Sequence, residues 1–138
     1  MTAIRIIQWV ARIAGAIALL LGLSRWIAGL NIITLHMLFG IIVALDMLAL
    51  GVLLLATPRM RLLGLISIVY ALILPIFGLT QFQLLVGNLH WLIQTAHLLV
   101  GIGALVYIQI IGLRYERLKR SPASDSVLSR ESASQAGK

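Results

Sequence analysis

The sequence predicts an all-α membrane protein, a four-helix bundle whose helices all cross the bilayer. Of its 138 residues, 61% are hydrophobic and 11% are charged, and the mean hydropathy is +1.06, whereas soluble domains carry about 25% charged residues. Four apolar stretches each approach the roughly 20 residues that an α-helix needs to span a bilayer. They lack the alternation of a membrane β-barrel, so we expect helices rather than strands. The expected spans cover residues 6–29, 33–56, 62–79 and 91–113.

Basic residues flank these spans and predict how the chain crosses the membrane. The tight turn at residues 57–61 carries Arg59 and Arg61, and a second basic cluster follows residue 113. Because such cations stay on the cytoplasmic side, we expect both termini to be cytoplasmic and the connections 25–31 and 80–90 to lie outside. The net charge of +7 therefore fits a lipid bilayer as the partner, and we expect no nucleic-acid binding.

We expect residues 1–118 to form one transmembrane domain and residues 119–138 to form a disordered cytoplasmic tail. The tail is rich in serine, alanine and charge and lacks the apolar side chains needed to pack. The N-terminal span resembles a signal peptide, but Ser24-Arg25-Trp26 after it is a poor cleavage context, so we expect it to remain as the first helix. The expected location is a bacterial inner membrane.

The two halves of the chain resemble each other, which predicts two helical-hairpin repeats. A shift of 61 residues places His36 on His97 and Gly40 on Gly101, and a shift of 49 residues aligns the first spans of the two halves. The shifts differ because the second outer connection is the longer one. Both hairpins would start on the cytoplasmic side, so the repeats are parallel and related by an axis along the membrane normal.

Each half carries one His-x-x-x-Gly pattern inside an apolar span, at His36 with Gly40 and at His97 with Gly101. An imidazole is costly in a membrane, so it faces the bundle interior and marks a functional site. A glycine one turn later lies on the same face and leaves a groove beside the ring. Two such histidines facing each other suit the axial ligands of one haem iron. We therefore predict one haem b, with His36 and His97 as metal ligands and the two glycines lining its groove.

Two further side chains near the outer ends of the spans complete the expected site. Arg25 is the expected counter-charge for a haem propionate, or it only extends toward the outer water. His90 lies seven residues before His97, on nearly the same helix face and two turns closer to the outer surface. We expect His90 beside a propionate, and it is also the rival of His97 as iron ligand. A zinc site formed by all three histidines is a further alternative.

Asp46 is the only acidic residue in the four expected spans and lies about 15 Å from His36 along the helix. One interpretation is a proton or quinone site on the cytoplasmic side of the haem. The favoured interpretation is structural: an ion pair with Arg12, or a carboxyl group kept neutral by burial.

The four spans, together with His36, His97 and their glycines, resemble the small four-helix membrane cytochromes b, the cytochrome b561 and ferric-reductase-like groups. This resemblance implies haem binding and electron transfer. Those families commonly hold two haems through four histidines, whereas this chain has three histidines. One haem is therefore expected.

The leading functional hypothesis is electron transfer between a membrane quinone and an outer-side redox protein or a larger membrane complex. Bis-histidine ligation leaves no open position for oxygen. The chain has no cysteine, and no phosphate loop, activated nucleophile or carboxylate pair is visible, so it is at most an oxidoreductase or electron carrier. Two alternatives stay open: a (bacterio)chlorophyll-binding subunit with one ring on each histidine, and a cofactor-free structural or accessory subunit whose histidines bond neighbouring helices.

Overall fold

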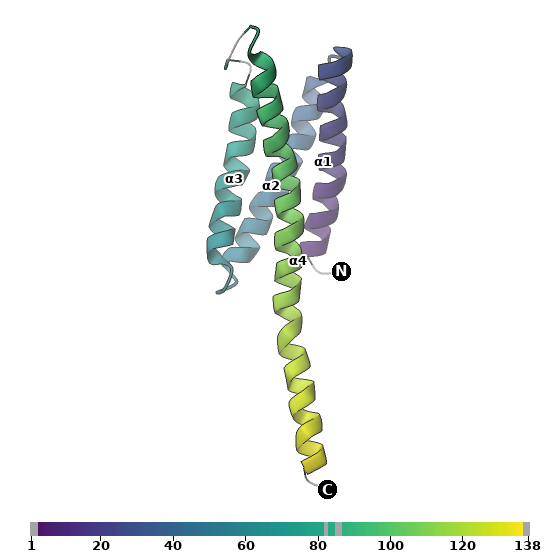
Figure 1. Cartoon of the computed structure of the whole chain (residues 1–138), viewed down its shortest axis with the longest axis vertical. Coiled ribbons are helices and arrows are strands. Elements are labelled where there is room, and N and C mark those ends of the chain that lie inside the picture. The colour runs from purple at the N-terminus through teal and green to yellow at the C-terminus, as the bar shows by residue number, and fades with distance from the viewer. Residues whose placement is uncertain (1–2, 82, 85–86, 137–138) are drawn as a thin grey trace.

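The protein is an all-α bundle of four long apolar helices, as the sequence predicts. The computed structural model describes residues 3–81, 83–84 and 87–136, with side chains as far as residue 119. Its helices are α1 (Ala3–Ala28), α2 (Ile33–Leu55), α3 (Arg61–Thr80) and α4 (His90–Ala136) (Figure 1). All four are long and apolar enough to cross a membrane, α4 through the part from His90 to Lys119.

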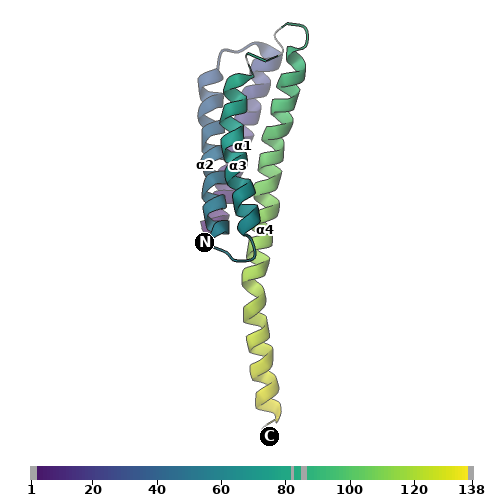
Figure 2. The same cartoon turned by 90° about the vertical axis from the view of Figure 1, so that its left-hand side faces the viewer.

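The four helices lie side by side, and consecutive helices run in opposite directions (Figures 1 and 2). The N-terminus and the α2–α3 turn lie at the end of the bundle from which α4 emerges, which we call the basic end because the turn carries Arg59. The α1–α2 and α3–α4 connections lie at the opposite end, which we call the loop end. The turn at the basic end is closed by a hydrogen bond from the Met60 amide to the Thr57 carbonyl (2.9 Å).

Large apolar side chains cover the outside of the bundle. Ile27, Leu62 and Leu20 are 79%, 71% and 64% exposed, and such residues occur on all four helices. A soluble protein rarely leaves so much contiguous apolar surface uncovered. The outer surface therefore indicates contact with lipid, and the chain is an integral membrane protein.

The buried core of the bundle is centred on the half nearer the basic end. The buried apolar side chains of the described residues lie in that half or at the middle of the bundle: Ile4, Ala11 and Ala14 of α1, Val43, Ala44, Met47, Leu50 and Leu54 of α2, Met60, Ala71 of α3, and Ala104, Ile108 and Ile111 of α4. Helices α2 and α3 are closest at a pair of glycines. A Cβ atom on Gly64 would lie 2.8 Å from both the Gly51 carbonyl oxygen and the Leu55 amide nitrogen, so only glycine permits this approach.

Polar side chains also join α4 to its neighbours, in the packed half and near the middle of the bundle. Gln8 and Gln109 exchange hydrogen bonds, because the Nε2 of each donates to the backbone carbonyl of the other (3.1 and 3.3 Å). The Tyr70 hydroxyl of α3 donates to the Val100 carbonyl (2.7 Å). Each such bond between membrane helices contributes about 0.6–2 kcal/mol, so α4 is fixed against both α1 and α3.

Helix α4 differs in length from the expected span. It continues to Ala136, well past the expected domain boundary at residue 118, and its last part projects beyond the bundle in both views (Figures 1 and 2). A helix without tertiary contacts is only marginally stable in water. The disorder expected for residues 119–138 therefore stays a prediction.

Candidate cofactor cavity

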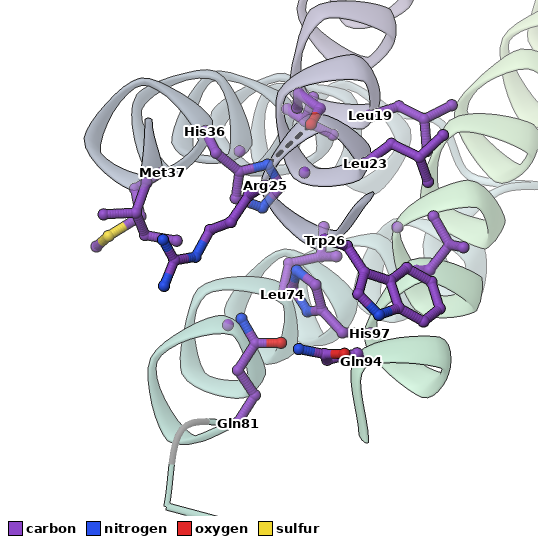
Figure 3. Close-up of a pocket in the computed structure, with 18 of the residues that line it drawn as sticks. Leu19, Leu23, Arg25, Trp26, His36, Met37, Leu74, Gln81, Gln94 and His97 are labelled. Atoms are coloured by element: carbon purple, nitrogen blue, oxygen red, sulfur yellow. Dashed lines mark hydrogen bonds between the residues drawn. The ribbon is translucent and has the colours of Figure 1, made fainter. Parts of the chain in front are cut away.

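The half of the bundle nearer the loop end is hollow. It contains a cavity of about 450 Å³ to which all four helices contribute, a volume within the range of small-molecule sites. Most of its lining is apolar. The polar lining residues are Arg25, His36, Gln81, His90, Gln94 and His97, and the lining glycines are Gly15, Gly22, Gly29, Gly40, Gly78 and Gly101 (Figure 3).

His36 of α2 and His97 of α4 meet inside this cavity. Their ring centroids are 6.0 Å apart and their ring planes are inclined by 63°. An imidazole nitrogen lies about 2 Å from a bound metal ion and about 1 Å from its own ring centre, so two imidazoles on opposite sides of one metal have ring centres roughly 6 Å apart. The two rings therefore have the separation that one shared metal ion requires.

His36 is held in one orientation by α1. Its Nδ1 lies 2.8 Å from the Ala18 carbonyl oxygen. A carbonyl can only accept a hydrogen bond, so Nδ1 carries the proton and the lone pair is on Nε2. Gly22, which like Ala18 belongs to α1, leaves room for the His36 ring, because a Cβ at residue 22 would lie 3.0 Å from His36 Cε1. A metal-binding histidine is typically oriented in this way, with its second nitrogen donating to a carbonyl.

His97 lacks the corresponding hydrogen bond. Its Nδ1 is buried and has no hydrogen-bond partner among the described residues. Its ring packs near Phe77 of α3, with centroids 5.7 Å apart, and beside Gly78, where a Cβ would lie 3.4 Å from its Cε1. The two histidines therefore occupy similar glycine-lined positions but differ in what holds them.

Gly40 and Gly101 border open space. No described atom lies within 4 Å of the position that a Cβ would take at either residue. A glycine that serves close helix packing behaves differently, as Gly64 does in the packed half. These two glycines therefore leave room in the cavity rather than bringing helices together.

Arg25 and His90, the other two residues expected at the site, both line the cavity. Arg25 is in the last turn of α1, which ends at Ala28 and is followed by Gly29 in a left-handed conformation (φ 66°) that favours glycine. His90 is the first residue of α4, and its Nδ1 lies 3.4 Å from the Leu84 carbonyl oxygen. The described residues contain no group of three metal-binding side chains, so the alternative zinc site is not formed.

Gln81 and Gln94 line the same cavity but were not predicted. Gln94 lies three residues before His97, which puts it on the same helix face; this spacing was the available signal. Gln81 follows the last residue of α3 and is only 9% exposed. No pattern in the sequence marked Gln81, because its burial depends on how α3 ends.

The predicted ion pair between Asp46 and Arg12 is wrong. Arg12 Nε donates to Gln109 Oε1 (2.8 Å), and the guanidinium lies 5.3 Å from the centre of the Trp9 ring. Asp46 is partly buried, and its Oδ2 has no hydrogen-bond partner among the described residues. Helix α1 packs against both α2 and α4, and Arg12 lies on the side of α1 that meets α4. Helical periodicity alone does not predict which of the two neighbouring helices a residue of α1 contacts.

The cavity offers three features that a flat macrocycle with a central metal would use. The two imidazoles have the required separation, the proton position on His36 leaves Nε2 free to bind a metal, and two glycines border open space. Arg25 adds a fixed positive charge to the lining. No protein-family model, curated protein or solved structure matches the chain.

Proposed function

We propose that the chain is an integral membrane haem b protein in which His36 and His97 are the two axial ligands of one haem. The observation that carries this proposal is the pair of imidazoles 6.0 Å apart inside a cavity of about 450 Å³. The open space beside Gly40 and Gly101 gives the ring a place that does not displace other side chains.

In this proposal each residue has a separate task. His36 binds through Nε2 and is oriented by the Ala18 carbonyl, and His97 binds from the opposite side. Arg25 pairs with a propionate in the forked geometry of guanidinium and carboxylate. Bound haem supplies reversible one-electron chemistry, and two histidine ligands favour electron transfer over oxygen chemistry. The mostly apolar lining suits the hydrophobic faces of the ring.

We further propose that the chain is a parallel repeat of two hairpins. In each hairpin the first helix places a glycine against the histidine of the second, Gly22 against His36 and Gly78 against His97. These glycines are 56 residues apart, since 78 − 22 = 56, whereas the first spans align with a shift of 49. The two alignments differ by seven residues, which is about two helical turns. Pairing Gly22 with Gly78 therefore keeps each glycine on the same face of its helix as the alignment by 49 residues does.

The basic end is proposed to face the cytoplasm of a bacterium, with the cavity toward the outer face of the inner membrane. Arg59 and Arg61 flank the α2–α3 turn at that end, and such residues stay on the cytoplasmic side. A fluorescent protein fused after Lys138 should be bright in intact cells, and alkaline phosphatase fused there should be inactive. A dark fluorescent fusion together with an active phosphatase fusion would place the C-terminus and the basic end outside, contrary to the proposal. With this orientation the electron partners are a membrane quinone and a redox protein on the outer side.

An absorption spectrum of the purified protein tests the cofactor. We expect a sharp Soret band and, after reduction, split α and β bands of a six-coordinate haem, with one haem per chain. A far-red band would instead identify a chlorophyll. No visible absorption after expression with an ample haem supply would contradict the proposal and favour a cofactor-free subunit.

A further inference from the structure

The two histidines are held unequally by the protein. His36 donates from Nδ1 to the Ala18 carbonyl at 2.8 Å, and its ring lies against Gly22. His97 has a buried Nδ1 with no hydrogen-bond partner within the described part of the chain. The similar glycine environments therefore do not make the two rings equivalent.

This difference changes how strongly each imidazole binds a metal. A hydrogen bond from the second ring nitrogen orients the imidazole and makes the coordinating nitrogen more basic, and its loss typically lowers metal affinity 10–100-fold. A buried N–H without an acceptor also costs free energy for as long as the ring stays in place. His97 is therefore expected to bind a metal more weakly than His36 does. Its Nδ1 could gain a hydrogen-bond acceptor if the ring moved.

The surroundings of His97 offer such partners. Figure 3 shows the side-chain amides of Gln81 and Gln94 beside it, and all three residues line the one cavity. Both amides carry an acceptor oxygen. Leu74 and Trp26 line the same cavity, so apolar groups as well as amides surround the space that the ring would enter or leave.

We propose that His97 is an exchangeable ligand and that its side of the cavity binds a neutral diatomic molecule in place of the imidazole. This inference rests on the proposed haem function. In the exchange the imidazole nitrogen of His97 leaves the metal and the diatomic molecule takes its place, and no electron is transferred. The lining is mostly apolar, and its one charged side chain, Arg25, is paired with a propionate in the proposed function. An anion would therefore lose its hydration without gaining a matching charge, which favours a neutral molecule. His36 remains bound on the opposite face.

Carbon monoxide is a suitable probe, since it binds reduced haem only at a vacant or vacated position. The experiment uses the full-length haem-loaded protein in detergent, reduced with dithionite. We expect carbon monoxide to replace the α and β bands of the unaltered protein with those of a carbon monoxide complex. In H97A we expect haem to be retained and carbon monoxide to bind faster than in the unaltered protein, because no imidazole has to leave first.

The outcomes separate this inference from the function on which it rests. A six-coordinate haem that does not react with carbon monoxide would overturn the exchange and leave the proposed function standing. Greater haem loss in H97A than in H36A would show that the asymmetry runs the other way, and it too would overturn the inference. A protein that binds no haem would overturn the function itself. The measurement on the unaltered chain decides the matter even if a variant fails to fold.

Discussion

Replacing His36 with alanine is expected to remove the low-spin haem spectrum and most of the bound haem. The substitution deletes the ligand that α1 orients through the Ala18 carbonyl. Because His97 alone has no hydrogen bond to hold its ring, the loss in haem affinity should exceed the 10–100-fold that follows when only a supporting hydrogen bond is removed. Haem content by the pyridine haemochrome assay and the reduced spectrum measure the effect.

The comparison variant is H90A, because His90 is the rival of His97 as ligand. His90 sits at the start of α4 near the Leu84 carbonyl, whereas His97 is the histidine whose ring lies 6.0 Å from that of His36. The low-spin bands should therefore survive in H90A. If H90A and H36A lose these bands while H97A keeps them, His90 rather than His97 is the second ligand.

A large side chain in the space beside the histidines should also reduce the amount of haem that the protein binds. A Cβ added at Gly40 or Gly101 meets no other helix within 4 Å, and both residues line the cavity, so we expect a leucine there to take up cavity space. Overfilling a site costs about 1–3 kcal/mol, which is roughly a 5- to 140-fold loss of haem affinity. We expect G40L and G101L to insert normally, to keep their helicity and to carry less haem.

Two further substitutions show whether the loss is specific to the cavity. G40A adds only a methyl group to open space and should keep most of its haem. G64A places its Cβ 2.8 Å from backbone atoms of α2 and should lower the melting temperature of the bundle itself. Full haem occupancy in both leucine variants would contradict the role assigned to Gly40 and Gly101.

The sequence alone predicts the helices well because membrane spans depend on one local property. Hydropathy places each expected span within a few residues of α1, α2 and α3, since any 20-residue apolar segment must form its hydrogen bonds internally. The far end of α4 could not be predicted in this way, because residues 119–138 are polar. Their state depends on tertiary contacts and not on hydropathy.

The cavity could be predicted only in part. Repetition of His-x-x-x-Gly singles out His36, Gly40, His97 and Gly101, and the structure places all four around one cavity; their role as cofactor ligands stays a prediction. The carbonyl that orients His36 belongs to Ala18, which carries no chemical signal in the sequence. Backbone groups and buried amides of this kind depend on helix rotation and crossing, which periodicity does not determine.

The division of the bundle into a packed half and a hollow half sets an order of assembly in the cell. The half at the basic end buries its apolar side chains, such as Met47, Leu50 and Ile108, without help from any other molecule. It therefore holds the four helices together as soon as they are inserted. The loop-end half has few such contacts, so it opens at the lowest cost. If the cavity holds haem as proposed, the haem would enter late in biogenesis, on a scaffold already packed at its opposite end.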